Sequence, residues 1–141
     1  MISQTEQIIN MGIEFVSKNK IDDRSTNLLQ GLLELRTLTI NLGRQAGHTS
    51  YIKKHATRSD LIIVPSLHIA RYCYGDLPQS YRIIPIDYFS QSEKTFSRVR
   101  GLKFDTIWVD KSGMKCGLED LMVGLLISGC LTNNTMIVSL G

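Results

Sequence analysis

A glycine-containing stretch in the first third of the chain carries the residue types that a phosphate site needs. Residues 43–49 read Gly-Arg-Gln-Ala-Gly-His-Thr. Small residues let backbone N–H groups surround a phosphate, a cation reaches the outer oxygens, and a hydroxyl at a helix N-terminus binds Mg²⁺. The two glycines and Thr49 fit that layout. The cation position holds His48 in place of lysine, and the position of the usual first glycine holds Leu42.

An aspartate that ends an apolar run is the second candidate. The run 104–109 is followed by Asp110, and a carboxylate at such a strand end holds Mg²⁺ through its water shell beside the loop threonine. We therefore predict that Thr49 and Asp110 form the metal-side pair if Mg²⁺ binds. The next residue, normally the glutamate that polarises the attacking water, is Lys111, which cannot act as a base while protonated. Efficient hydrolysis is not expected.

The same residues also have plain structural interpretations. The glycines could simply form a tight turn between a strand and a helix. Asp110 could cap the next segment or pair with Lys111 or Arg44, and His48 could pack locally. Trp108, within the apolar run, is more typical of a core than of a ligand platform.

The elements that must position these residues follow from the hydrophobic pattern. Strands are predicted at 37–42, 61–64, 81–84, 104–109 and 135–139, and helices at 4–17, from Asp22-Asp23 to Arg36, 49–58, 66–72 and 118–131. Short apolar strands that alternate with helices favour parallel pairing with both faces covered. We expect a three-layer α/β/α sandwich with a mainly parallel sheet of about five strands, preceded by two N-terminal helices. Ligands in such folds bind beyond the carboxyl ends of the strands.

Composition limits the class of protein. The chain has 141 residues, 43% hydrophobic and 21% charged, with a net charge of +3, which predicts one folded domain over 1–141. Within it, 1–36 form a helical segment and 37–141 the core. No apolar run reaches the ~20 residues that cross a bilayer, and no secretory signal is visible, so we expect a cytoplasmic protein without a membrane partner. Three widely spaced cysteines, with no Cys-x-x-Cys pair, argue against a disulfide framework and against a four-ligand zinc site.

The positive charge is concentrated in the middle of the chain. Residues 44–115 hold twelve basic and six acidic side chains, whereas the flanks hold four basic and seven acidic ones. An ordinary solvated surface is one interpretation. The other is a surface that faces a polyanion, either nucleotide phosphates or a nucleic-acid backbone.

The order of the segments resembles the ATPase domain of phage terminase large subunits and related helicase-type P-loop proteins. Residues 43–49 are similar to the family's deviant Walker A motif, in which Arg-Gln precede Gly-Lys-Thr. Residues 61–66 resemble its strand that ends in Pro-Thr, and 100–110 resemble its Arg-Gly lead into Walker B. Residues 135–139 resemble its coupling strand, which ends in a small hydroxyl residue. The likeness covers residues 37 to 141.

The resemblance implies a P-loop NTPase-like core with ATP and Mg²⁺ as cofactors. It implies that Arg44 contacts the γ-phosphate, that Ser139 senses it, and that Thr49 and Asp110 lie on the metal side. The family's Walker lysine and catalytic glutamate have no counterpart here. The predicted nucleotide- or phosphate-binding residues are Gly43, Arg44, Gln45, Ala46, Gly47, His48, Thr49, Ser50 and Ser139.

Three functions follow as hypotheses. The first is a small viral (phage) degenerate P-loop protein, in the host cytoplasm, that binds a nucleotide or nucleic-acid phosphates with little or no hydrolysis. The second is a protein-interaction module, a regulator or decoy of a host or viral protein, that uses an ATPase-like scaffold. The third is a true NTPase with rearranged catalytic residues, in which Glu93 or Glu119 supplies the base.

Overall fold

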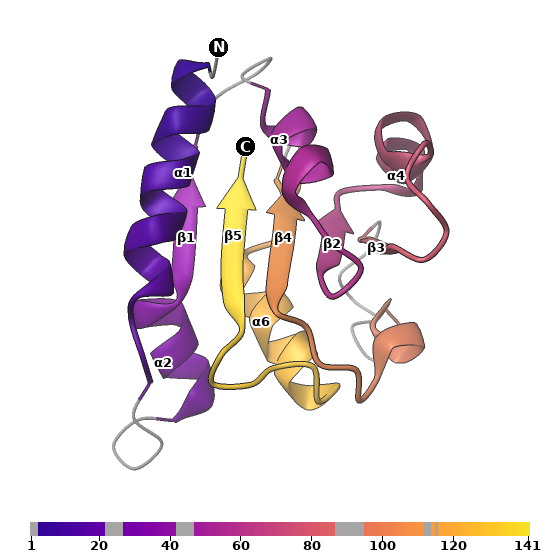
Figure 1. Ribbon diagram of the computed structural model, residues 1–141. Coiled ribbons are helices and arrows are strands. Elements are labelled where there is room, and N and C mark those ends of the chain that lie inside the picture. Colours follow the sequence, from indigo (N-terminus) through magenta and orange to yellow (C-terminus); the bar gives the residue numbers. More distant parts are fainter. Residues whose placement is uncertain (1–2, 22–26, 42–46, 87–94, 112–113, 115) are drawn as a thin grey trace.

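Five parallel strands form one sheet in the order β1-β5-β4-β2-β3 (Figure 1). The computed structural model describes residues 3–21, 27–41, 47–86, 95–111, 114 and 116–141. The strands are β1 (Thr37–Ile40), β2 (Leu61–Val64), β3 (Arg82–Pro85), β4 (Thr106–Asp110) and β5 (Met136–Leu140). The predicted α/β class and parallel pairing are confirmed.

Helices follow or precede each strand, and side-chain caps fix where several of them begin. They are α1 (Gln4–Ser17), α2 (Leu28–Leu35), α3 (His48–His55), α4 (Leu67–Tyr74), the 3₁₀ helix η2 (Ser97–Val99) and α6 (Leu118–Ile127). The side chains of Ser3, Asn27 and Ser66 each accept a hydrogen bond from an N–H in the first turn of α1, α2 and α4.

Three predicted helix boundaries were wrong. The helix predicted over 49–58 ends at His55, where the N–H of Ala56 bonds to the carbonyl of Ile52. The second helix begins at Leu28 because Asn27 caps it, and the predicted caps Asp22 and Asp23 lie outside the described residues. The helix predicted to reach residue 131 ends at Ile127. Gly129 has a φ of +74° there, and its N–H bonds to the carbonyl of Leu126 while the N–H of Cys130 bonds to that of Leu125. These two bonds form the glycine-terminated helix end known as a Schellman motif.

Side chains alternate between the two faces of the sheet and build a separate core on each. One face packs against α1, α3 and α4; its buried residues include Ile9, Ile52, Ile62, Tyr74, Trp108 and Val138. The other packs against α2 and α6; its buried residues include Leu32, Ile63, Ile107, Leu121, Leu125 and Ile137. The arrangement is a three-layer sandwich with α1 and α2 on opposite faces of the sheet.

The amino end of the sheet is held by a buried carboxylate. Asp60, which is 5% exposed, accepts hydrogen bonds from the backbone N–H of Thr57 (2.9 Å), from that of Thr106 (3.2 Å) and from Nε1 of Trp108 (3.1 Å). Charged acceptors make strong hydrogen bonds, and this one joins β4 to the turn before β2. Trp108 is therefore a core residue, as its place in an apolar strand predicts.

The crossover from β1 to β2 positions the candidate site. It passes over β5 and β4, so α3 lies against β4 with its N-terminus near the carboxyl end of that strand (Figure 1). The chain leaves β4 toward α6, on the other face. Strands whose outgoing connections turn to opposite faces open a crevice at their carboxyl ends. No helix among the described residues has the length and apolar character to cross a bilayer.

Candidate phosphate-binding site

Asp110, the last residue of β4, is the centre of a buried polar cluster. Its side chain is 1% exposed. Oδ1 lies 3.1 Å from Nε2 of His48. Oδ2 accepts a hydrogen bond from Thr49 Oγ1 at 2.8 Å and another from the Tyr74 hydroxyl at 2.8 Å. A buried carboxylate needs such donors because burial without them is costly.

Three elements bring the cluster together. His48 and Thr49 begin α3, Tyr74 ends α4, and Asp110 ends β4. Both helices lie on the same face of the sheet, so they direct these side chains to one point at its carboxyl edge. Burial and the neighbouring carboxylate raise the pKa of Tyr74, so its hydroxyl stays protonated and remains a donor.

The start of α3 has a backbone shape that suits an anion. Gly47 is the N-cap residue with a φ of +86° and a ψ of 12°, a left-handed conformation that glycine adopts without strain. Gly47 has no side chain that could cap this helix. The first helical hydrogen bond runs from the N–H of Tyr51 to the carbonyl of Gly47. The N–H groups of residues 48–50 therefore point toward the crevice end of the helix, where the helix dipole favours negative charge.

The structure brings together part of the predicted phosphate-binding set. Gly47, His48, Thr49 and Ser50 open α3, and two of them contact Asp110. The predicted residues Gly43, Arg44, Gln45 and Ala46 lie outside the described residues.

Ser139 is not part of the cluster. It lies on β5 and is 0% exposed. Its side chain shares the sheet face of Ile137, opposite to that of Asp110, because residues two apart on a strand share a face. Within the described part of the chain, its Oγ has no hydrogen-bond partner. Its predicted sensor role stays a prediction.

The two substituted catalytic positions differ in what surrounds them. His48, at the lysine position, is 6% exposed and pairs with Asp110. Lys111 donates its backbone N–H to the carbonyl of Leu140, and its ammonium forms no ion pair within the described residues. The alternative in which Lys111 neutralises Asp110 is therefore wrong. Of the candidate bases, Glu119 is exposed in the first turn of α6, and Glu93 lies outside the described residues.

Sequence reasoning missed Tyr74. Nothing in its local pattern marks it, since an aromatic residue at the end of an amphipathic helix is more often part of a core. Its role depends on the strand order, which places β2 and the helix that follows it next to β4. Only the tertiary arrangement could have found it.

The cluster leaves little room for a metal on the carboxylate. A carboxylate offers about four lone-pair sites, and three neighbouring side chains already face those of Asp110. Among the described residues there is no group of three or more His, Cys, Asp or Glu side chains that could hold a metal ion. This donor set does not suit directly bound Mg²⁺, and we derive no step through one.

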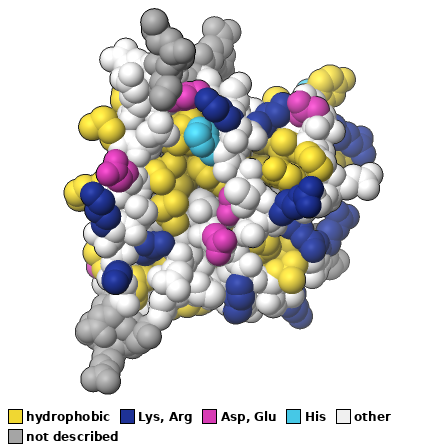
Figure 2. Space-filling model, in the orientation of Figure 1, with side chains coloured by type: hydrophobic (Ala, Val, Ile, Leu, Met, Phe, Trp, Pro, Cys, Tyr) yellow, Lys and Arg dark blue, Asp and Glu magenta, His cyan; other side chains and the backbone are white. Residues whose placement is uncertain are grey.

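Among the described residues, the positive charge of the central segment lies mostly away from the cluster. In Figure 2 most Lys and Arg side chains gather on the right, on the side of α4, β3 and η2. Near α3 the lysines are paired, Lys53 with Asp76 at 2.8 Å and Lys54 with Glu6 at 3.4 Å. Exposed basic residues of α4, β3, η2 and the segment before β4 are Arg71, Arg82, Arg98, Arg100 and Lys103.

Comparisons of the chain with protein-family models, with curated proteins and with solved structures find no match.

Proposed function

We propose that the chain binds the phosphate groups of a nucleotide, or those of a nucleic-acid backbone, at the carboxyl edge of the sheet with little or no hydrolysis. The observation that carries this proposal is the 2.8 Å hydrogen bond between Thr49 and Asp110, which are 61 residues apart in the chain. These are the two groups that the sequence predicts to lie together: the hydroxyl of a loop with P-loop-like spacing, and a carboxylate at the end of a strand. The degenerate P-loop assignment of residues 37–141 and a viral origin belong to the same proposal.

The start of α3 supplies the binding chemistry in this proposal. The backbone N–H groups of residues 48–50 donate to a phosphate, since the N-cap residue Gly47 has no side chain to accept from them. The contacts of Thr49 and His48 with Asp110 hold this first turn of α3 at the end of β4. Arg44, which precedes this turn in the sequence, supplies the positive charge that the missing lysine would have provided.

Binding without turnover follows from the residues present. A positioned general base contributes about 10²–10⁴-fold to rate, and Lys111 occupies the place of that base. The Asp110 carboxylate is engaged by protein donors, so it offers no direct ligand to a metal that would activate water. ATP should therefore bind and remain intact.

Calorimetric titration with ATP, ADP and GTP, each with Mg²⁺ and with EDTA, tests the proposal. We expect binding heat in both conditions. The affinity should be about fivefold weaker, or lost, in Thr49→Ala, since this variant loses the hydrogen bond to Asp110 that positions the first turn of α3, a bond worth on the order of 1 kcal/mol. Arg44→Ala should behave in the same way. Thr57→Ala is the matched control because Thr57 is exposed at the opposite end of α3. Absence of heat in the wild-type protein, or equal loss in the control, would overturn the proposal.

A second candidate function is a protein-interaction module that keeps the ATPase-like scaffold. Two substitutions favour it: His48 and Lys111 stand where a lysine and a glutamate would be needed for turnover. A stoichiometric protein partner whose binding is unchanged by ATP and by Thr49→Ala would favour this function over the first.

A further inference from the structure

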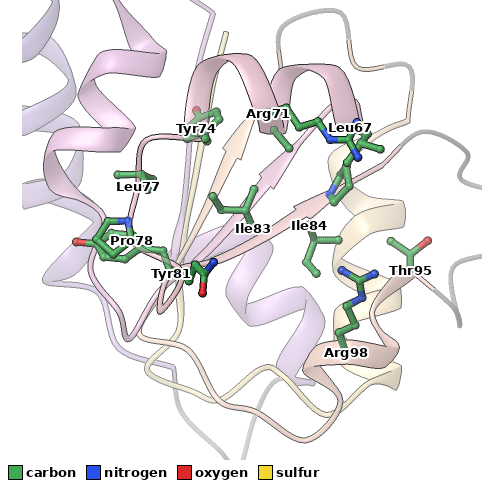
Figure 3. A pocket seen from close by; sticks show the side chains of 14 residues that line it. Leu67, Arg71, Tyr74, Leu77, Pro78, Tyr81, Ile83, Ile84, Thr95 and Arg98 are labelled. Atoms are coloured by element: carbon green, nitrogen blue, oxygen red, sulfur yellow. The ribbon is translucent and has the colours of Figure 1, made fainter.

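A groove of about 550 Å³ lies along the open edge of the sheet beside β3 (Figure 3). It is bounded by α4, the turn at 77–81, β3 itself and the segment 95–98. Cavities of this size suit a segment of a few residues or a small organic ligand. Tyr74, which donates to Asp110, also lines this groove, whereas His48 and Thr49 are not among its lining residues.

The groove spans both faces of the sheet edge. Ile83 packs with the core on the α4 side, and Ile84 belongs to the core on the opposite side. Arg71 comes from α4 and Arg98 from η2, and Figure 3 shows Ile84 between these two arginines. Each side of the edge therefore offers one isoleucine and one guanidinium group.

The backbone of β3 offers hydrogen-bonding groups to this groove. The N–H of Ile86 donates to the carbonyl of Val64 in the neighbouring strand β2 at 2.9 Å. Alternate residues of a strand face the same neighbour, so Ile84 also faces β2 while the N–H and C=O of Ile83 face the open edge. Pro85, which has no N–H to present, suits an edge position.

The charged side chains among the described residues that line the groove are both arginines, Arg71 and Arg98. No acidic side chain is among the described residues that line it. Arg71 and Arg98 form no ion pair within the part of the chain that the structure describes. An arginine fork binds a carboxylate through paired N–H donors, so these two residues favour an acidic occupant.

We propose that this groove binds an extended acidic peptide of a partner protein, which adds as a strand to the edge of β3. Side chains of an added strand alternate between the two sides of the edge. Because each side offers an isoleucine and an arginine, two apolar residues followed by two acidic ones complement the groove. The mostly apolar lining favours a peptide over a nucleic-acid backbone. This inference deepens the second candidate function, for which it names the surface and the partner chemistry.

The probe is a fluorescein-labelled peptide with the repeat Val-Ile-Glu-Glu, and the control peptide has lysine in place of glutamate. Fluorescence anisotropy should show binding of the acidic peptide alone. Arg71→Ala and Arg98→Ala should each weaken binding about fivefold, the effect of losing one partly exposed ion pair. Arg58→Ala, an exposed arginine before β2, is the matched control and should leave the affinity unchanged.

N-methylation of the peptide tests strand addition itself. Only every second N–H of an added strand faces β3, so methylation of one alternate set should abolish binding while methylation of the other should not. No binding, or equal effects of the two methylated sets, would overturn the proposal. So would an oligo-dT of twelve nucleotides that binds in place of the peptide and loses affinity in the same arginine variants. Thr49→Ala should leave peptide binding intact, so failure here is distinguishable from failure of the phosphate site.

Discussion

Replacement of Tyr74 by phenylalanine removes one hydroxyl from the polar cluster and leaves the ring in place. The residue is 1% exposed, and its hydroxyl donates to the Asp110 carboxylate at 2.8 Å. Loss of a hydrogen bond to a buried charged group lowers the free energy of unfolding by about 2 kcal/mol. For a chain of 141 residues, the unfolding entropy is roughly 0.3 kcal/mol per degree, so the Tm should fall by about 7 °C.

Thermal unfolding followed by circular dichroism measures this change, with Tyr72→Phe as the matched control. Tyr72 belongs to the same helix but is 79% exposed, so its variant should unfold within about 1 °C of the wild-type protein. In an Asp110→Asn background, Tyr74→Phe should cost less, because a neutral acceptor forms a weaker bond. Equal Tm values for the two tyrosine variants would refute the assignment of Tyr74 to the cluster.

The pH dependence supplies a second test of the same contact. Burial and the carboxylate raise the pKa of Tyr74 in the folded protein, so the folded state holds this proton more tightly than the unfolded state does. The stabilisation is complete below the pKa of an unfolded tyrosine, about 10, and is lost as the pH rises above it. The difference in stability between the wild-type protein and Tyr74→Phe should therefore shrink above that pH. A difference that stays constant through this range would contradict the assignment.

Three further predictions concern other parts of the fold. Asp60→Ala should lower the unfolding free energy by about 3 kcal/mol in urea titrations, because it leaves Trp108 Nε1 and two backbone N–H groups without their acceptor, and nucleotide binding should not change. Gly47→Ala should cost about 1 kcal/mol in the same assay through backbone strain alone, since a Cβ there meets nothing within 4 Å. Burial raises the pKa of the Cys130 thiol, so a disulfide reagent should label Cys73 first and Cys130 only as fast as the protein unfolds, as read by mass spectrometry.

The strands and the layered class could be predicted because their signals are local. Four residues such as 61–64 are wholly apolar and end at a proline, and the structure buries all four. The start of α2 after Asn27 and the end of α6 before Gly129 were missed, because a helix end depends on which polar side chain or glycine caps it. Several residues near each boundary could have served as the cap.

The Thr49–Asp110 contact could be predicted because Thr49 follows β1 and Asp110 ends β4, and strands that are expected to be parallel end at one edge of the sheet. Two features could not be predicted: the contact of Tyr74 with Asp110, and the position of the Ser139 side chain on the sheet face opposite to that of Asp110. The first depends on the order of strands in the sheet, which hydrophobic periodicity does not determine. The second depends on register, in which a shift of one residue moves a side chain to the other face.

Amide chemical-shift mapping by NMR during an ATP titration tests the central proposal most directly. We predict that the largest shift changes fall on the backbone amides of residues 47–50, with smaller changes at Asp110, both with Mg²⁺ and with EDTA. Thr49→Ala should reduce them while Thr57→Ala leaves them unchanged. Changes confined to other surfaces, or no change at millimolar ATP, would contradict a phosphate site at the start of α3.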